Sequence, residues 1–98
     1  MSILHLVNKS PYERDSLDVC AAYAKEGDAV LLIEDAVYAA IKGGSAADKL
    51  ANLDVSVMGA DLSARGIGED KLVDGVKVVD YAAFVDMVEG NDKVQSWL

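Results

Sequence analysis

The stretch Ala29-Val30-Leu31-Leu32-Ile33 is an unbroken apolar run between the polar pairs Gly27-Asp28 and Glu34-Asp35. An apolar run of this length without polar alternation is typical of a strand that is buried on both faces of a sheet. Such strands belong to parallel sheets with helices on both sides. Residues 29–33 are therefore predicted to form a buried strand of a parallel sheet.

Strands and helices are predicted to alternate along the whole chain. Short apolar runs indicate three further strands, and the segments between them have helical spacing or helix-start signals. No strand or helix is predicted in the tail, which ends on Trp97-Leu98. We therefore expect one domain over residues 1–98, an α/β/α sandwich of three layers with a mainly parallel sheet of four to five strands. The other strands are predicted at 3–7, 55–58 and 76–79, and the helices at about 11–25, 36–41, 45–52, 61–65 and 81–89.

Four side chains are expected to begin helices: Ser10, Asp35, Ser45 and Asp61. Ser10, with Glu13 three residues later, has the spacing of a capping box, in which each of the two residues bonds the backbone N–H of the other. Asp35 and Asp61 are expected to cap short helices, because a carboxylate can accept a free N–H group of the first turn.

Composition limits the classes of partner. The chain has 98 residues, a net charge of −8, 52% hydrophobic residues and a mean hydropathy of +0.18. The negative charge argues against direct contact with nucleic acid or an anionic membrane surface. No apolar stretch reaches the length of a membrane-spanning helix, and the first residues do not resemble a signal peptide. We expect a cytoplasmic protein whose excess apolar surface lies in subunit interfaces.

Most familiar catalytic sites are not indicated. His5 is the sole histidine and lies between two leucines, where a hydrogen-bonded core histidine is expected. Glu34-Asp35 follows a strand and could hold a hard cation, but the helix cap is the better account. The glycine pairs at 43–44 and at 66 and 68 do not match a phosphate-binding loop. We therefore predict neither a metal nor a cofactor.

Cys20 is the single cysteine and lies within the first predicted helix. Two interpretations follow. Cys20 lies at helical spacing from Leu17 and Ala24, so it can pack as a small core residue. Alternatively it is a nucleophilic thiol that carries a persulfide sulfur and passes it to a partner. Its position in the middle of a helix gives it little help from the helix dipole.

Taken in order, several segments resemble the DsrH/TusB family of small sulfur-relay subunits, and most closely its DsrH branch. The resemblance covers nearly the whole chain. Each segment is weak by itself, and the set in this order is specific. One departure is Ala36, where the family often has glycine. The matching segments are Leu4-His5-Leu6-Val7, Ser10-Pro11, residues 27–38, Asp61-Leu62-Ser63-Ala64-Arg65-Gly66, residues 79–85 and Val94-Gln95-Ser96-Trp97.

The resemblance implies a fold, partners and a role. Such subunits assemble with DsrE-like and DsrF-like partners as a heterohexamer, and the main active cysteine lies on the DsrE-type partner. In the DsrH branch the complex passes persulfide sulfur to a small carrier of the DsrC/TusE type during oxidation of stored sulfur. In the TusB branch a homologous complex relays sulfur toward 2-thiouridine at the wobble position of tRNA. A cysteine where Cys20 stands is a DsrH-branch feature, which favours sulfur oxidation.

The sequence leaves three hypotheses. In the first, Cys20 is a persulfide carrier in a sulfurtransferase complex. In the second, the chain is a non-catalytic structural subunit. In the third, the same complex serves tRNA thiolation. Trp97 and Leu98 are expected to be interface anchors or satellite core contacts. For Arg65 the alternatives are binding to an acidic partner and solvation on a loop, and we expect the second.

Overall fold

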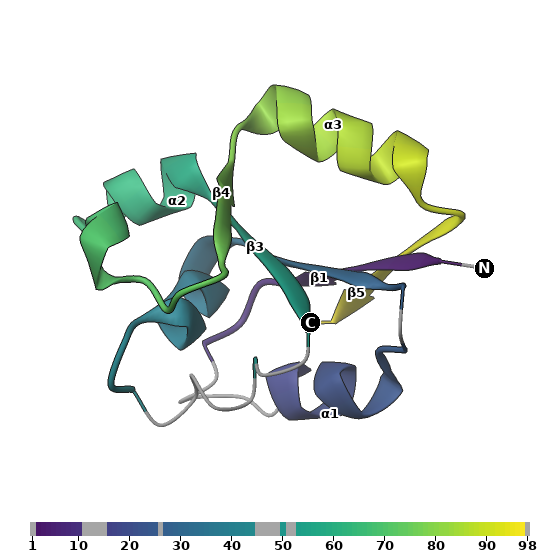
Figure 1. Ribbon diagram of the computed structural model, residues 1–98, viewed down its shortest axis with the longest axis horizontal. Coiled ribbons are helices and arrows are strands. Elements are labelled where there is room, and N and C mark those ends of the chain that lie inside the picture. Colours follow the sequence, from purple (N-terminus) through teal and green to yellow (C-terminus); the bar gives the residue numbers. More distant parts are fainter. Residues whose placement is uncertain (1, 11–15, 26, 45–49, 51–52, 98) are drawn as a thin grey trace.

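The fold is taken from a computed structural model, which describes residues 2–10, 16–25, 27–44, 50 and 53–97. Within these ranges strands alternate with helices and short 3-10 segments (Figure 1). The elements in chain order are β1 (Ile3–Val7), α1 (Ser16–Tyr23), β2 (Ala29–Leu32), η1 (Glu34–Ala40), β3 (Asp54–Met58), α2 (Gly59–Ala64), η3 (Glu69–Lys71), β4 (Lys77–Val79), α3 (Tyr81–Gly90) and β5 (Lys93–Trp97).

The strands form a single five-stranded parallel sheet in the order β4-β3-β2-β1-β5. β1 lies between β2 and β5, with Leu4 opposite Ala29 on one side and Val7 opposite Trp97 on the other. The predicted strands all appear within a residue or so of their expected bounds. The predicted α/β fold with a mainly parallel sheet is therefore confirmed.

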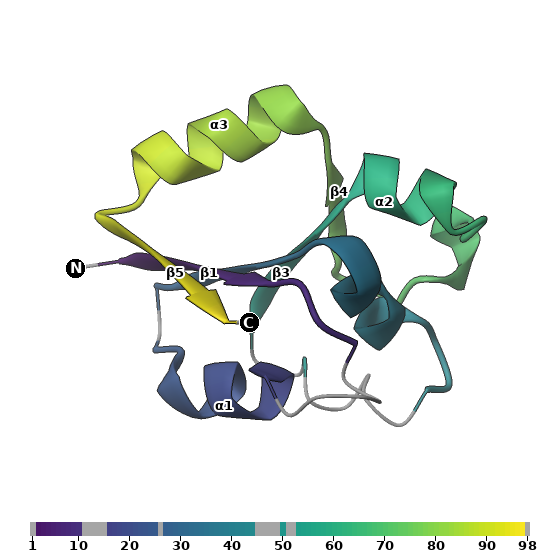
Figure 2. The same ribbon diagram turned by 180° about the vertical axis from the view of Figure 1, so that it is seen from behind.

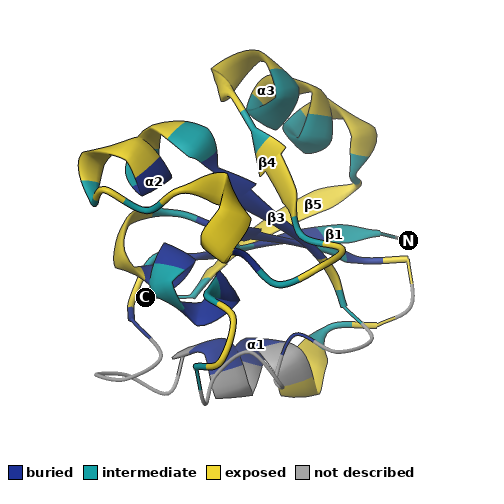
Figure 3. Ribbon diagram, turned by 60° about the vertical axis from the view of Figure 1, so that its left-hand side comes forward, coloured by how far each residue is buried: buried dark blue, intermediate teal, exposed yellow. Residues whose placement is uncertain are grey.

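Helices cover both faces of the sheet. Figures 1 and 2 show α1 on one face and α3 on the other. The larger core cluster joins α1 and η1 to the sheet, while a smaller one lies under α3. None of the residues of α3 is fully buried, and its outer surface is exposed in Figure 3. Asp80 begins this helix, because its Oδ1 accepts the N–H of Ala83 at 2.8 Å.

β5 is the strand that the sequence did not predict. Its residues Lys93-Val94-Gln95-Ser96-Trp97 contain no apolar run, and all except Trp97 are exposed. The sequence lacked the signal because an edge strand needs no continuous apolar stretch. β5 brings the end of the chain beside its beginning.

Two of the predicted caps are wrong. η1 begins at Glu34 after Ile33, and its amino end has no side-chain cap, so Asp35 does not cap it. α2 begins at Gly59, which places Asp61 inside its first turn, where Asp61 accepts the backbone N–H of Glu34 at 3.0 Å. The predicted capping-box residue Glu13 and the predicted helix at 45–52 lie outside the described residues, apart from residue 50.

Candidate functional site

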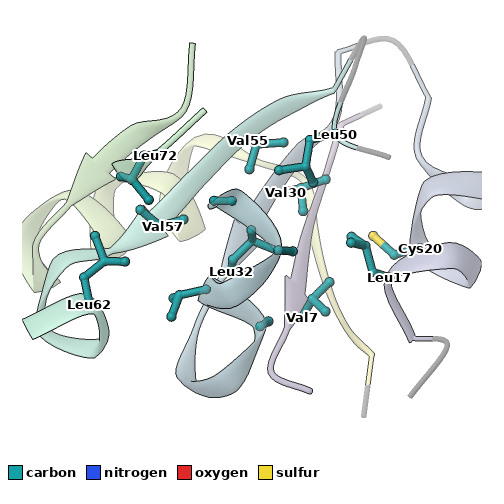
Figure 4. Packing of buried hydrophobic residues seen from close by; sticks show 14 residues of the cluster. Val7, Leu17, Cys20, Val30, Leu32, Leu50, Val55, Val57, Leu62 and Leu72 are labelled. Atoms are coloured by element: carbon teal, nitrogen blue, oxygen red, sulfur yellow. The ribbon is translucent and has the colours of Figure 1, made fainter. Parts of the chain in front are cut away.

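Cys20 lies on α1 and faces the sheet. Its side chain is 0% exposed and belongs to the larger core cluster. In Figure 4 the side chains of Cys20 and Leu17 extend from the helix toward Val7 and Val30. The helical spacing of Leu17 and Cys20 is therefore that of a core stripe, as the packing interpretation expected.

The environment of Cys20 also disfavours its ionised form. Burial raises the pKa of the Cys20 thiol, and the negative charge of Asp28 raises it further, to about 11. At pH 7 a thiol with such a pKa is a thiolate about one time in ten thousand, and the thiolate is the nucleophile. In this structure Cys20 is therefore a buried and neutral thiol. Its role as a persulfide carrier stays a prediction.

A buried polar network lies at the same end of the sheet. His5 on β1 is 2% exposed, and its Nε2 lies 3.0 Å from Oδ2 of Asp28. The indole Nε1 of Trp97 donates to Nδ1 of His5 at 3.0 Å. Nδ1 is therefore the acceptor nitrogen, so Nε2 carries the proton and donates to the carboxylate. The expectation that His5 is a hydrogen-bonded core histidine is confirmed.

Asp28 is the centre of this network. Besides the bond from His5, its carboxylate accepts the backbone N–H of Ile3 at 2.9 Å and of Lys25 at 3.0 Å. Burial acts to raise the pKa of Asp28, but the hydrogen bonds from His5, Lys25 and Ile3 outweigh it and hold the pKa below its usual value of 3.8. Asp28 thus joins the start of β1, the turn after α1 and, through His5, the residue Trp97 on β5.

Sequence reasoning missed this network. Asp28 follows a glycine after a helix, a position typical of an ordinary turn residue. Trp97 is separated from His5 by 92 positions in the sequence. Trp97 packs against the larger core cluster, so it is a satellite core contact within this chain. The other half of the predicted anchor pair, Leu98, lies outside the described residues.

A pocket of about 520 Å³ opens beside the network, between the end of α1 and β5. Tyr23 and Trp97 form an aromatic wall, with ring centroids 5.5 Å apart and planes inclined by 38°. The ring of His5 stacks on Trp97 at 6.0 Å. Lys25 and Lys93 also line the pocket. An apolar cavity with a few polar groups has the general form of a binding site.

The carboxylate of Asp35, shortly after β2, is engaged within the chain. Arg65 donates to Oδ1 of Asp35 from Nε at 3.1 Å and from Nη2 at 2.9 Å, and it lies 3.7 Å from Asp61. The expectation that Arg65 is simply solvated on a loop is therefore wrong. In the part of the chain that the structure describes, no three potential metal-ligating side chains of the His, Cys, Asp and Glu types lie together. Nor is any described helix long and apolar enough to span a bilayer.

The sequence is similar to known proteins over almost its full length. Residues 9–94 match the family model described as DsrH like protein. Protein TusB of Pectobacterium parmentieri is 33% identical over 97 residues, covering 97% of this chain and 100% of that protein. Protein TusB of Escherichia coli (strain K12 / DH10B) is 29% identical, with the same coverage of both chains.

Solved structures share the fold. The crystal structure of the ychN protein from E. coli superposes with a TM-score of 0.79 at 22% sequence identity, covering 98% of each chain. A protein of unknown function from Methanobacterium thermoautotrophicum, MTH1491, gives a TM-score of 0.66 at 16% identity over 96% of each chain. At these identities the likeness supports the architecture alone.

Proposed function

The chain belongs to the DsrH/TusB family of sulfur-relay proteins, and from this we propose that it is a structural subunit of a sulfur-relay complex whose reacting thiol lies on a partner. Its partners in this proposal are DsrE-like and DsrF-like subunits in a cytoplasmic heterohexamer, with a DsrC/TusE-type protein as sulfur carrier. The proposed pathway is 2-thiolation of the tRNA wobble uridine, since the similar curated proteins are named TusB.

The observation that carries the proposal is the burial of Cys20. A relay subunit that reacts must present a thiolate to a second protein, and the Cys20 side chain is 0% exposed, with a pKa raised to about 11. Transfer between two proteins also needs access for the incoming persulfide. A subunit that contributes to assembly, with the chemistry on a partner, requires neither exposure nor a lowered pKa.

A second candidate function is favoured by the presence of Cys20 itself. In the DsrH branch the complex serves oxidation of stored sulfur, and Cys20 would carry sulfur there. In that step the Cys20 thiolate attacks the outer sulfur of a donor persulfide R–S–SH. The S–S bond of the donor breaks, R–S⁻ leaves and Cys20 becomes a persulfide. The step requires α1 to expose Cys20 within the complex.

Genetic complementation tests the pathway and the role together. A strain lacking this chain should lose 2-thiouridine at the wobble position, and both the wild-type chain and C20A should restore it. If the deletion spares thiolated tRNA but stops consumption of stored sulfur, the tRNA pathway is wrong. If C20A assembles with its partners yet restores nothing, the structural role is wrong.

Mass spectrometry tests the chemistry of Cys20 directly. The assembled complex is incubated with a persulfide donor, and the intact mass of this chain is measured for wild type and C20S. An unchanged mass for both chains is expected. A gain of one sulfur atom on wild type that is absent in C20S would support the carrier role instead.

A further inference from the structure

We propose that the outer edge of β5 and the adjoining pocket bind an extended acidic segment of a partner protein. The segment adds a strand to the sheet and inserts an apolar side chain against Tyr23 and Trp97. The inference specifies the partner surface of the proposed subunit and rests on that proposed function only in requiring that the chain has a protein partner.

The first observation is the open edge of the sheet. β5 pairs with β1 on one side, and no described strand lies on its other side. Residues 93–96 are all exposed, as the colouring of β5 in Figure 3 shows. An exposed edge presents unpaired backbone N–H and C=O groups, which an extended peptide can satisfy.

The second observation is that the pocket follows the same strand. Lys93, Gln95 and Trp97 are alternate residues of β5, so their side chains share one face, and all three line the pocket; Val94 between them also contributes to its lining. Side chains of an added strand would alternate in the same way, and every second one would lie over this pocket. Strand pairing supplies affinity in such complexes, and pockets for alternate side chains supply selectivity.

The third observation is the exposed aromatic surface. Tyr23 is 65% exposed although its ring contacts Trp97. Tyrosine and tryptophan are the residues most often found at the centre of protein interfaces, where an apolar side chain of the partner excludes water from them. The wall formed by Tyr23 and Trp97 is therefore suited to an apolar or aromatic side chain.

The charged residues that line the pocket indicate which kind of peptide segment would bind there. Lys25 and Lys93 are exposed and line the pocket, and none of its described lining residues is acidic. The neighbouring carboxylate of Asp28 is buried and accepts three hydrogen bonds, and Asp92 accepts the N–H of Ser2. Both charged side chains that line the pocket are thus positive, in a chain of net charge −8. Complementary charge favours an acidic segment over a basic one.

Synthetic peptides test the inference on the full chain. The probe is the peptide Ac-Asp-Val-Phe-Val-Asp-NH2, compared with Ac-Lys-Val-Phe-Val-Lys-NH2 and with an acidic peptide whose backbone nitrogens are methylated. Trp97 is the only tryptophan, so its fluorescence reports on the pocket. NMR chemical shifts of the backbone amides report on β5. The acidic peptide should bind about ten-fold more tightly than the basic one at low salt, because two charge pairs are involved.

Charge reversal provides the decisive variant. K25E/K93E should bind the basic peptide more tightly than the acidic one, which damage to the fold would not produce. K42E/K71E makes the same charge change at exposed lysines away from the pocket and should bind as wild type does. Circular dichroism checks that both variants fold. If K25E/K93E does not fold, K93E alone should bind the acidic and basic peptides with equal affinity.

Several outcomes would overturn the inference. Absence of binding by any peptide, or equal binding of the acidic and basic peptides, contradicts it. If the methylated peptide binds as tightly as the acidic probe, or the amides of β5 do not shift, the segment binds through its side chains and adds no strand to the sheet, which also contradicts the inference. These results leave tRNA thiolation untouched, so failure here is distinguishable from failure of the proposed function.

Discussion

Replacing Asp28 by asparagine should break the network that joins the two ends of the chain. Oδ1 of Asp28 accepts the N–H of Ile3, while Oδ2 accepts both the N–H of Lys25 and the proton of His5 Nε2. An amide group has one acceptor oxygen and an NH2 donor. In D28N the amide oxygen can keep the Oδ2 position and its two donors, while the NH2 group at the Oδ1 position faces the N–H of Ile3. The variant therefore loses one hydrogen bond, and the two that remain lose their charged acceptor.

The expected loss is large for a domain of this size. Hydrogen bonds to charged groups contribute about 1.5–3 kcal/mol each and those between neutral groups about 0.5–1.5 kcal/mol, so losing one bond and weakening two should lower the free energy of unfolding by about 3–6 kcal/mol. The whole domain is expected to be stable by about 5–15 kcal/mol. Urea denaturation followed by far-ultraviolet circular dichroism measures the difference, and D92N, at an exposed carboxylate that accepts a single N–H, is the matched control.

The tautomer of His5 gives the prediction a second part. With the D28N amide turned so that its NH2 group faces His5, His5 could move its proton to Nδ1 and accept from the amide, but Nδ1 would then face the donor Nε1 of Trp97. In W97F that obstacle is removed. D28N should therefore cost less in the W97F background than in wild type, with a coupling of about 1 kcal/mol or more.

The effect of D28N on stability should also depend on pH. Because the folded-state pKa of Asp28 lies below its usual value of 3.8, the carboxylate stabilises the fold fully above the unfolded-state pKa and loses this effect as the pH falls through the folded-state value. The stability difference between wild type and D28N should therefore shrink from pH 6 to pH 3. A D28N loss below about 1 kcal/mol, additive effects of D28N and W97F, or a difference that grows in acid would refute the network.

Three further results are expected. In the native isolated chain Cys20 should react with an alkylating reagent orders of magnitude more slowly than in urea, and equal rates would contradict its burial. E34G should raise the free energy of unfolding by about 0.5–1 kcal/mol, because Glu34 has φ of 50° and only glycine adopts this value freely; a lower free energy of unfolding in urea denaturation would oppose this. D80A should lower the free energy of unfolding by about 1 kcal/mol, because it removes the side chain that caps α3. D86A, within the same helix, should change this free energy little. Similar losses for the two variants would contradict the capping role of Asp80.

Sequence patterns predicted those parts of the fold that depend on local burial. The runs at 3–7 and 29–33 are apolar because the inner strands are covered on both faces, so their composition reveals them. The helical spacing of Leu17 and Cys20 likewise marked a core stripe. β5 escaped prediction because it lies at the edge of the sheet, and its position beside β1 is fixed by pairing rather than by its own composition.

The polar contacts were less predictable because they depend on distant partners. Asp35 and Asp61 have the residue type of a helix cap, yet Arg65 engages the first and a backbone N–H of η1 the second. His5 was expected in the core, but no local pattern identified Asp28 and Trp97 as its partners. Such contacts appear only after the sheet order is known, and the reactivity of Cys20 depends on them too, since Asp28 raises its pKa.

The pairing of the first strand with the last has a consequence for biosynthesis. During translation β1 can pair with β2 early, but its other neighbour, β5, emerges from the ribosome after the other four described strands. Closing so long a loop is entropically costly, and contacts between such distant residues slow folding. Until then the indole of Trp97 is absent and Nδ1 of His5 lacks its donor. A nascent chain should therefore acquire full resistance to proteolysis only once β5 has been synthesised and has left the ribosome exit tunnel.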